Sequence, residues 1–351
     1  MRVVVVGASG NVGTSVLAAL GDEPAVDSVL GLARRLPEAQ FPKTDWASAD
    51  VSSSELVPLF QGADVVIHLA WLIQPGRELA TLRATNVEGS ARVFEAVAAS
   101  GVPALVYASS VGAYSPGPKD RRVDETWRTD GIESSFYARH KSEVESLLDG
   151  FERETPGVRV VRLRPALIFK REAASGIRRL FAGPFLPSPL VRRELIPVVP
   201  RTERFCFQAV HSRDVGDAYR LATLSEVRGP INIAAEPVLN SEVLGQLLAA
   251  RPLPVHPGLL RAGAALSYRL HLQPSEPGWL DMGLSVPLMD TTRAETELGW
   301  KPRYNADEAL RELLGGIRDR AGIETPPLAP GSGGPLRIRE LLSGVGRRAG
   351  L

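Results

Sequence analysis

The chain has 351 residues, of which 44% are hydrophobic and 23% charged, as in a globular protein with a real core. Its 41 basic and 40 acidic residues leave a formal net charge of +1, which gives no reason to expect nucleic acid or a membrane surface as a partner. A single cysteine, Cys206, excludes an internal disulfide and favours a cytoplasmic protein. The five histidines lack metal-ligand spacing, and no apolar run is long enough to span a bilayer. We therefore expect no bound metal and no membrane segment.

Short β-branched runs alternate with longer helical patterns over the first 164 residues. The predicted strands are 2–6, 28–33, 64–70, 104–110 and 158–164. The predicted helices are 11–20, 52–60, 78–100 and a further segment that holds Tyr137 and Lys141. Continuous apolar strands that alternate with helices indicate a parallel sheet covered on both faces. The predicted fold class is therefore α/β, with a doubly wound Rossmann sheet.

The pattern changes after Arg164, which suggests a second domain. Residues 166–206 are rich in proline and arginine, 209–224 and 230–235 return to the strand–helix rhythm, and 236–320 are mostly helical. We expect a Rossmann domain from 1–165 and 207–235, and a smaller substrate-binding domain from 166–206 and 236–322. Residues 323–351 are rich in Pro and Gly, and we expect a flexible tail. A short basic helix that docks on a partner is the alternative for this tail.

A glycine-rich loop, "VVVVGASGNVGTSV", joins the first predicted strand to the first helix. Glycine lets the backbone turn sharply and approach a pyrophosphate, while the helix N-terminus supplies amides and partial positive charge. The spacing alone is a weak signal, but its position between a strand and a helix makes it strong. We predict a dinucleotide site whose loop residues are Gly7, Ser9, Gly10, Asn11, Val12 and Gly13.

The end of the second strand indicates which dinucleotide is bound. An acidic residue there would bind the adenosine ribose and favour NAD. This chain has Ala33 followed by Arg34 and Arg35, whose guanidinium groups suit a 2′-phosphate. NADP is therefore favoured over NAD, with two solvated surface arginines as the alternative. Asp50, next to Val51, is a candidate acceptor for the adenine amino group.

Tyr137 and Lys141 lie four residues apart in "YARHK" and would share one face of a helix. An ammonium beside a phenol favours the phenolate and lowers the tyrosine pKa, so that Tyr137 could exchange a proton with an alcohol near neutral pH. Ser110 closes the strand "LVYASS" and could hydrogen-bond the same oxygen. Hydride would move to or from a nicotinamide bound beside them. The motif by itself is weak, and a solvated helix face is its alternative.

Several segments match one known family in the order that the family has them: "GASGNVG", "DVVIHLA", "NVEGS", "VYASSVGAY", "YARHK", "LRPALIF", "VHSRDVGDA" and "DTTRAETELGWKPR". In these segments the chain resembles the extended short-chain dehydrogenase/reductases, the NAD-dependent epimerase/dehydratase group. The resemblance covers roughly residues 1–320 and implies a site in the cleft between two domains, and a homodimer. It implies that Tyr137 is the general acid/base, Lys141 its ribose-binding partner and Ser110 the catalytic serine. It also implies that Asn86 orders the proton relay. Residues implied to line the nicotinamide pocket are Leu69, Ala70, Pro165 and Ala166.

Three departures from the family pattern narrow the expected chemistry. The Asp-Glu pair of sugar-nucleotide 4,6-dehydratases is Val111 and Gly112 here, so dehydration is not expected. The arginine with which epimerases grip a diphosphate is Phe207, although Arg204 lies nearby in sequence. The glycine after "IF" is Lys170. Together these residues favour a substrate less charged than a nucleotide sugar.

Three hypotheses follow for the function. The first is an NAD(P)-dependent carbonyl reductase or alcohol dehydrogenase that acts on a moderately apolar small molecule. The second is an epimerase that keeps its cofactor tightly bound and uses it twice on one substrate. The third is a regulator that binds a dinucleotide without turnover, which the presence of the tyrosine–lysine pair disfavours.

Overall fold

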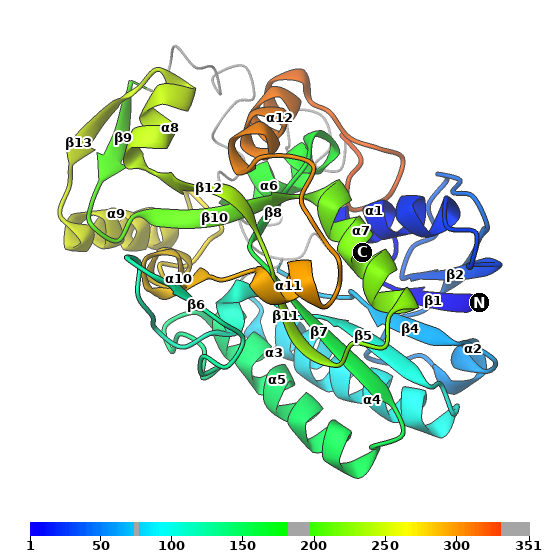
Figure 1. Ribbon diagram of the computed structural model, residues 1–351. Coiled ribbons are helices and arrows are strands. Elements are labelled where there is room, and N and C mark those ends of the chain that lie inside the picture. The colour runs from blue at the N-terminus through cyan, green and yellow to red at the C-terminus, as the bar shows by residue number, and fades with distance from the viewer. Residues whose placement is uncertain (74–76, 182–196, 331–351) are drawn as a thin grey trace.

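A seven-stranded parallel sheet forms the centre of the computed structural model, which describes residues 1–73, 77–181 and 197–330 (Figure 1). Its strand order is β11-β7-β5-β4-β1-β2-β3, and every pairing is parallel. The strands are β1 (Arg2–Val6), β2 (Ser28–Ala33), β3 (Thr44–Ser48), β4 (Val65–His68), β5 (Ala104–Ala108), β7 (Arg159–Pro165) and β11 (Gly229–Ile233). The strand order reverses direction at β1, as in a doubly wound Rossmann sheet. The predicted fold class is confirmed.

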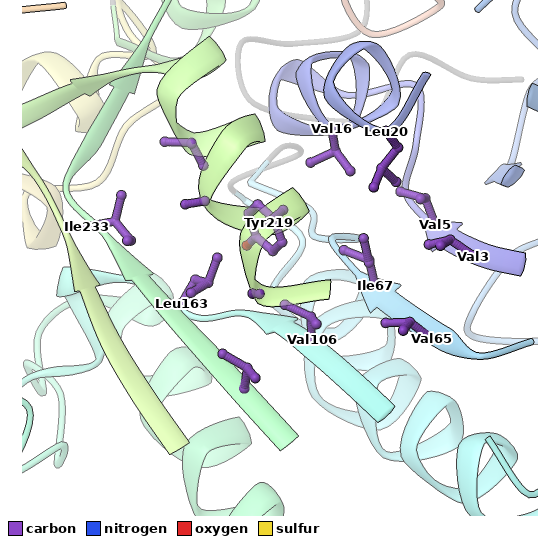
Figure 2. Close-up of a cluster of buried hydrophobic side chains, with 14 of the residues drawn as sticks. Val3, Val5, Val16, Leu20, Val65, Ile67, Val106, Leu163, Tyr219 and Ile233 are labelled. Carbon is purple, nitrogen blue, oxygen red and sulfur yellow. The ribbon is translucent and has the colours of Figure 1, made fainter. Parts of the chain in front are cut away.

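Helices cover both faces of this sheet (Figure 1). One face packs against α1 (Asn11–Gly21) and α7 (Ser212–Leu224), and Figure 2 shows the apolar side chains that fill this layer, among them Val16, Ile67 and Tyr219. The other face packs against α2, α4 and α5. The helices on this second side are α2 (Val57–Phe60), α3 (Leu79–Arg83), a π-helical turn (Ala84–Glu88), α4 (Gly89–Ala99) and α5 (Phe136–Glu154). Burial on both faces explains why the strands read as continuous apolar runs.

Smaller elements lie beyond the carboxyl ends of the strands. The short strands are β6 (Arg122–Val123), β8 (Leu167–Phe169), β9 (Val198–Arg201), β10 (Cys206–His211), β12 (Ala235–Asn240), β13 (Arg251–Pro254) and β14 (Leu288–Met289). The helices are α6 (Ala174–Phe181), α8 (Ser241–Leu248), α9 (Pro257–Arg269), α10 (Gly278–Ser285), α11 (Thr292–Thr296) and α12 (Ala306–Asp319), with 3-10 turns at Val111–Ala113 and Arg171–Ala173. Strands β8, β10 and β12 form a three-stranded sheet, while β9 pairs with β13 and β6 with β14.

Several predicted boundaries differ from the structure. The helix expected over 52–60 begins only at Val57, because Asp50 accepts hydrogen bonds from the backbone and hydroxyl of Ser52, which forms a turn instead. The helix expected over 78–100 is interrupted by the π-helical turn. Strand β3 was not predicted. The boundary expected at residue 207 falls inside β10, which pairs with β8 and β12 and not with the large sheet. The division into two domains stays a prediction.

The segment predicted as a flexible tail is packed over its first residues. Thr325 and Leu328 are 1% and 3% exposed. The Leu328 carbonyl accepts a hydrogen bond from Ser175 in α6, and the Glu324 carbonyl accepts one from the Ala39 amide. The predicted start of the tail at residue 323 is therefore too early. Residues 331–351 lie outside the described part of the chain.

Candidate active site

The glycine loop connects β1 to the first turn of α1, as predicted. Gly7 has a positive φ of 85°, and a Cβ on it would lie 2.6 Å from the Ala70 amide nitrogen. A Cβ on Gly13 would lie 2.4 Å from the Ala8 carbonyl oxygen. At Gly10, by contrast, the nearest atom is the Gly7 carbonyl oxygen at 3.5 Å. The fold itself requires glycine at positions 7 and 13, whereas Gly10 leaves open space over the loop.

The loop residues fit a dinucleotide phosphate. Gly10 is the N-cap of α1, makes no side-chain cap, and is followed by no acidic residue in the first turn. The first amides of a helix lack partners within the helix, and the helix dipole favours an anion there. Ser9, Asn11 and Val12 occupy the same loop and helix start.

Lys170, where the family has glycine, lies beneath the first turn of α1 and is 5% exposed. Its ammonium donates to the Asn11 carbonyl (2.8 Å), the Thr14 hydroxyl (2.6 Å) and the Ser15 hydroxyl (3.2 Å). Burial lowers the pKa of Lys170 to about 8. This lysine therefore ties β8 to the dinucleotide loop and does not face a substrate.

The residues predicted for the adenosine end lie at the carboxyl ends of β2 and β3. Arg34 and Arg35 are exposed, and the Arg34 carbonyl accepts a hydrogen bond from Ser48. Asp50 is half-buried and its carboxylate is engaged by Ser52, while Val51 is buried. Neither an adenine contact of Asp50 nor a 2′-phosphate contact of the arginines is tested by the structure, so both stay predictions.

The predicted nicotinamide-pocket residues end neighbouring strands of the sheet. Leu69 and Ala70 follow β4, and the Leu69 amide donates to the Val6 carbonyl at 2.8 Å. Pro165 ends β7, and the Ala166 amide donates to the Ile233 carbonyl at 2.9 Å. Parallel strands bring these carboxyl ends to one edge, which is where ligands bind in doubly wound folds.

Ser110 and Tyr137 meet at this edge. Ser110 follows β5, is 8% exposed, and its hydroxyl accepts a hydrogen bond from the Gly112 amide at 3.0 Å. Tyr137 lies in the first turn of α5 and is half-buried. Burial raises the pKa of the Tyr137 hydroxyl, and a hydrogen bond with Ser110 partly opposes this rise. The predicted hydroxyl pair is therefore within hydrogen-bonding reach.

Lys141 lies one turn after Tyr137 and is 3% exposed. Its ammonium donates to the Ala108 carbonyl at 2.6 Å and lies 3.4 Å from the centre of the Trp71 ring, but 5.9 Å from the centre of the Tyr137 ring. Burial holds the pKa of Lys141 well below its usual range, against the opposing effect of Glu145. The expected lowering of the Tyr137 pKa by Lys141 is therefore wrong for this arrangement, because burial of the phenol outweighs an ammonium directed at Ala108 and Trp71.

Two tryptophans that were not predicted from the sequence lie beside Tyr137. The ring centroid of Trp71, which follows β4, is 5.9 Å from that of Tyr137, and that of Trp279 in α10 is 5.0 Å away with the rings 35° apart. Trp71 was detectable, because it directly follows "HLA" at the end of a predicted strand. Trp279 had no local signal, because only the packing of α10 on α5 brings it to the site.

Glu145 continues the face of α5 that carries Tyr137 and Lys141, again one turn further on, and is 1% exposed. Its carboxylate accepts hydrogen bonds from Arg164 (2.9 and 3.0 Å), Arg162 (2.9 Å) and the Ser109 hydroxyl (2.5 Å). Through Ser109 this buried network fixes the end of β5 next to Ser110. The sequence analysis missed it, although the four-residue spacing from Lys141 was visible.

The side chain of Asn86 is bonded to the backbone of the segment that follows β4. It lies in the π-helical turn, is 0% exposed, and its amide accepts from the Leu72 nitrogen (2.7 Å) and donates to the Leu72 carbonyl (2.8 Å). Both polar atoms of the side chain are thus used to hold the segment after β4. Asn86 therefore holds the segment that carries Trp71, and its predicted place in the proton relay stays a prediction.

The departures from the family pattern also have structural consequences. A Cβ on Gly112 would lie 2.8 Å from Cε1 of Tyr137, so a larger residue at this position would require the Tyr137 ring to shift. The Arg204 guanidinium donates to the carbonyls of Leu284 (2.8 Å) and Gly117 (2.7 Å). Arg204 is therefore held by backbone carbonyls near Phe207.

Among residues 1–73, 77–181 and 197–330, no group of three or more His, Cys, Asp or Glu side chains is arranged to hold a metal ion. Within the same ranges, no helix combines the length and apolar character needed to cross a bilayer.

Comparison with known proteins identifies the family of this chain. It also finds relatives that are described as uncharacterized proteins. The model of the NAD dependent epimerase/dehydratase family matches residues 3–183. The chain is 28% identical to Rv2047c of Mycobacterium tuberculosis over 92% of its own length, but spans only 31% of that protein. It is 24% identical to Rv0501 of the same organism, over 90% of this chain and 83% of the relative. Both relatives are described as uncharacterized proteins.

Solved structures share the fold. MoeE5 in complex with UDP-glucuronic acid and NAD is 21% identical, with a TM-score of 0.67 over 91% of this chain and 99% of MoeE5. UDP-glucose 4-epimerase from Thermotoga maritima, bound to UDP-glucose, is 20% identical with a TM-score of 0.65 over the same shares. The matched family model covers the glycine loop, Ser110, Tyr137 and Lys141. The chain belongs to the NAD-dependent epimerase/dehydratase family, within the extended short-chain dehydrogenases/reductases.

Proposed function

We propose that this protein is an NAD(P)-dependent epimerase that oxidises a secondary alcohol of its substrate and reduces it again with the cofactor retained. The observation that carries the proposal is the Ser110–Tyr137 hydroxyl pair, which lies at the sheet edge that also carries the glycine loop, with Ser110 close enough to lower the Tyr137 pKa against the effect of burial. Epimerisation in preference to net reduction is supported by the family and by structural neighbours such as UDP-glucose 4-epimerase.

The side chains of the site suit proton transfer to and from one oxygen. A nicotinamide bound there would take up a hydride from carbon and return it. Ser110 would hydrogen-bond the substrate oxygen, and Tyr137 would accept its proton or donate one to it. Because burial raises the pKa of Tyr137, its hydroxyl is protonated at neutral pH in this arrangement, which suits the reductive half of the reaction. Lys141 would hold the ribose.

The residues available for the cofactor are the glycine loop, Leu69, Ala70, Pro165, Tyr137 and Lys141. NAD is supported by neighbours solved with NAD, including MoeE5. The preference for NADP predicted from Arg34 and Arg35 receives no support from these neighbours. The homodimer and the cytoplasmic location stay predictions.

Net reduction of an apolar carbonyl is the second candidate. It is favoured by the rings of Trp71 and Trp279 beside Tyr137, and by Phe207 in place of a diphosphate-binding arginine. Val111 and Gly112 disfavour a dehydratase, because neither residue has an acidic side chain to donate a proton.

The experiment incubates purified protein in D₂O with UDP-hexoses and with apolar secondary alcohols or ketones, each with NAD(H) or NADP(H). An epimerase gives an inverted product with no net change in reduced nicotinamide and no deuterium on the inverted carbon. A reductase consumes reduced cofactor in proportion to product. Tyr137→Phe should lower either rate by about 10²- to 10⁴-fold, whereas Tyr304→Phe, away from the site, should not. Turnover that is equally fast in Tyr137→Phe would contradict the proposed role of this residue.

A further inference from the structure

Helix α9 presents an apolar face to the solvent. None of its residues is buried, and Leu259 and Leu266 are 69% and 58% exposed, with Leu270 at its C-cap 57% exposed. These leucines are spaced by seven and four residues, so they share one helix face. Ala262 and Gly263, both exposed, fall on the same side. We call Leu259, Leu266 and Leu270 the leucine face.

The opposite side of α9 is the side attached to the protein. The Arg77 guanidinium lies 3.8 Å from the centre of the Tyr268 ring and donates to the Tyr268 carbonyl. Arg261 pairs with Asp281 of α10 at 2.9 Å. A surface helix normally turns its apolar stripe toward the core and its polar residues outward. In α9 the most exposed side chains are apolar, while polar contacts of Arg77 and Asp281 join half-buried residues such as Leu260 and Ala264 on the attached side.

Two further exposed leucines flank the helix in the sequence. Leu253 in β13 and Leu272 just after α9 are each 47% exposed. Strand β13 leads into α9 along the chain, and Figure 1 shows both at the periphery of the molecule, away from the seven-stranded sheet. Large exposed apolar surfaces often mark interaction sites.

The chain that forms the leucine face and its surroundings is basic, although Arg261 is paired with Asp281 on the attached side. Residues 243–275 contain no aspartate or glutamate, but include Arg251, Arg261, Arg269, His256 and His271. The overall charge balance of the chain therefore hides a local basic segment. Leucines that face outward between basic residues are the pattern of helices that lie in the interface of an anionic lipid surface.

We propose that the leucine face of α9 docks on an anionic lipid surface. A second copy of this chain fits less well, because a twofold contact through the leucine face would bring the exposed Arg269 toward its own copy. Docking would also place the candidate site close to the lipid, because α10 follows α9 and carries Trp279 against Tyr137. The proposal does not depend on the proposed function, and it replaces the expectation that the protein has no membrane partner.

The test is flotation of the full-length protein with vesicles of phosphatidylcholine alone, or with about one third phosphatidylglycerol. Wild type should bind the anionic vesicles and show little binding to the neutral ones. The double variant Leu259→Ser/Leu266→Ser should lose at least about tenfold in partitioning. Arg251→Gln/Arg269→Gln should lose about ten- to thirtyfold on anionic vesicles only.

A matched control is Leu36→Ser/Leu147→Ser, which removes two leucines that are 54% and 36% exposed elsewhere. It should bind like wild type, and thermal unfolding should show that all variants are folded. Absence of binding to anionic vesicles would overturn the proposal, as would binding that survives Leu259→Ser/Leu266→Ser. A wild-type dimer that these two substitutions dissociate, without vesicle binding, would assign the leucine face to a second copy instead.

Discussion

Replacement of Glu145 by alanine should destabilise the protein strongly. Its carboxylate is 1% exposed and accepts hydrogen bonds from two buried arginines and Ser109. Without the Glu145 carboxylate, Arg164 still donates hydrogen bonds to the Tyr114 hydroxyl and the Glu125 carbonyl, but no negative charge compensates its own. Removal of one partner from a buried ion pair costs about 3–5 kcal/mol, since the other charge stays buried and uncompensated.

The pKa of Glu145 gives a second value for the free energy that this carboxylate contributes to folding. Burial by itself raises this pKa, but hydrogen bonds and charges from Arg164 and Arg162 bring it down from 4.5 to about 2. A pKa about 2.5 below its ordinary value corresponds to about 3 kcal/mol of stability. Because the folded-state pKa is the lower one, this contribution is complete above pH 4.5 and is lost as the pH falls toward about 2.

The assay is thermal and urea unfolding at neutral pH, with Glu143→Ala as the control. Glu143 lies on the same helix and pairs with Arg83 through two 2.6 Å contacts, but it is 40% exposed. Glu145→Ala should lower the melting temperature by about 6 °C or more, and Glu143→Ala should cost about 0–1 kcal/mol. If the two variants lost the same small amount of stability, the reasoning about the buried network would be refuted.

Three further predictions concern the dinucleotide loop and its supports. In wild type, Lys170 loses its proton at a lower pH in the folded state than in the unfolded state, so the free energy of unfolding should rise by about 3 kcal/mol between pH 8 and about 10.5. Lys170→Met should remove this rise. The urea midpoints of the two proteins across this pH range measure the difference. Gly13→Ala should lower stability by about 2 kcal/mol or more, because its Cβ would approach the Ala8 carbonyl to 2.4 Å, and a melting temperature equal to wild type would contradict this. Asn86→Ala should cost about 2–3 kcal/mol, since the Leu72 amide and carbonyl lose their buried partners, and hydrogen exchange should increase at Leu72.

The sequence was informative wherever a function depends on a short local pattern. The glycine loop and the Tyr137–Lys141 spacing are properties of one loop and one helix, so they were predicted directly. The pKa of Tyr137 was predicted in the wrong direction, because burial by Trp71 and Trp279 depends on distant segments. The partner of Asn86 was missed for the same reason.

Other features were present in the sequence but were hidden by values taken over the whole chain or by the usual patterns of helices. The net charge of +1 concealed the acid-free segment 243–275. The outward direction of the leucine face could not be predicted, because an apolar helix stripe is expected to face the core. Glu145 continued a spacing already recognised for Tyr137 and Lys141, but only its burial shows that it matters.

The most direct test of the central claim is to denature purified protein and quantify the nicotinamide dinucleotide that is released. The comparison is with Gly10→Ala, whose Cβ would meet no protein atom closer than the Gly7 carbonyl at 3.5 Å. Wild type should carry or take up NAD(H) or NADP(H), whereas Gly10→Ala should be equally stable but bind at least about tenfold more weakly. A folded wild-type protein that neither retains nor binds either dinucleotide would contradict the account.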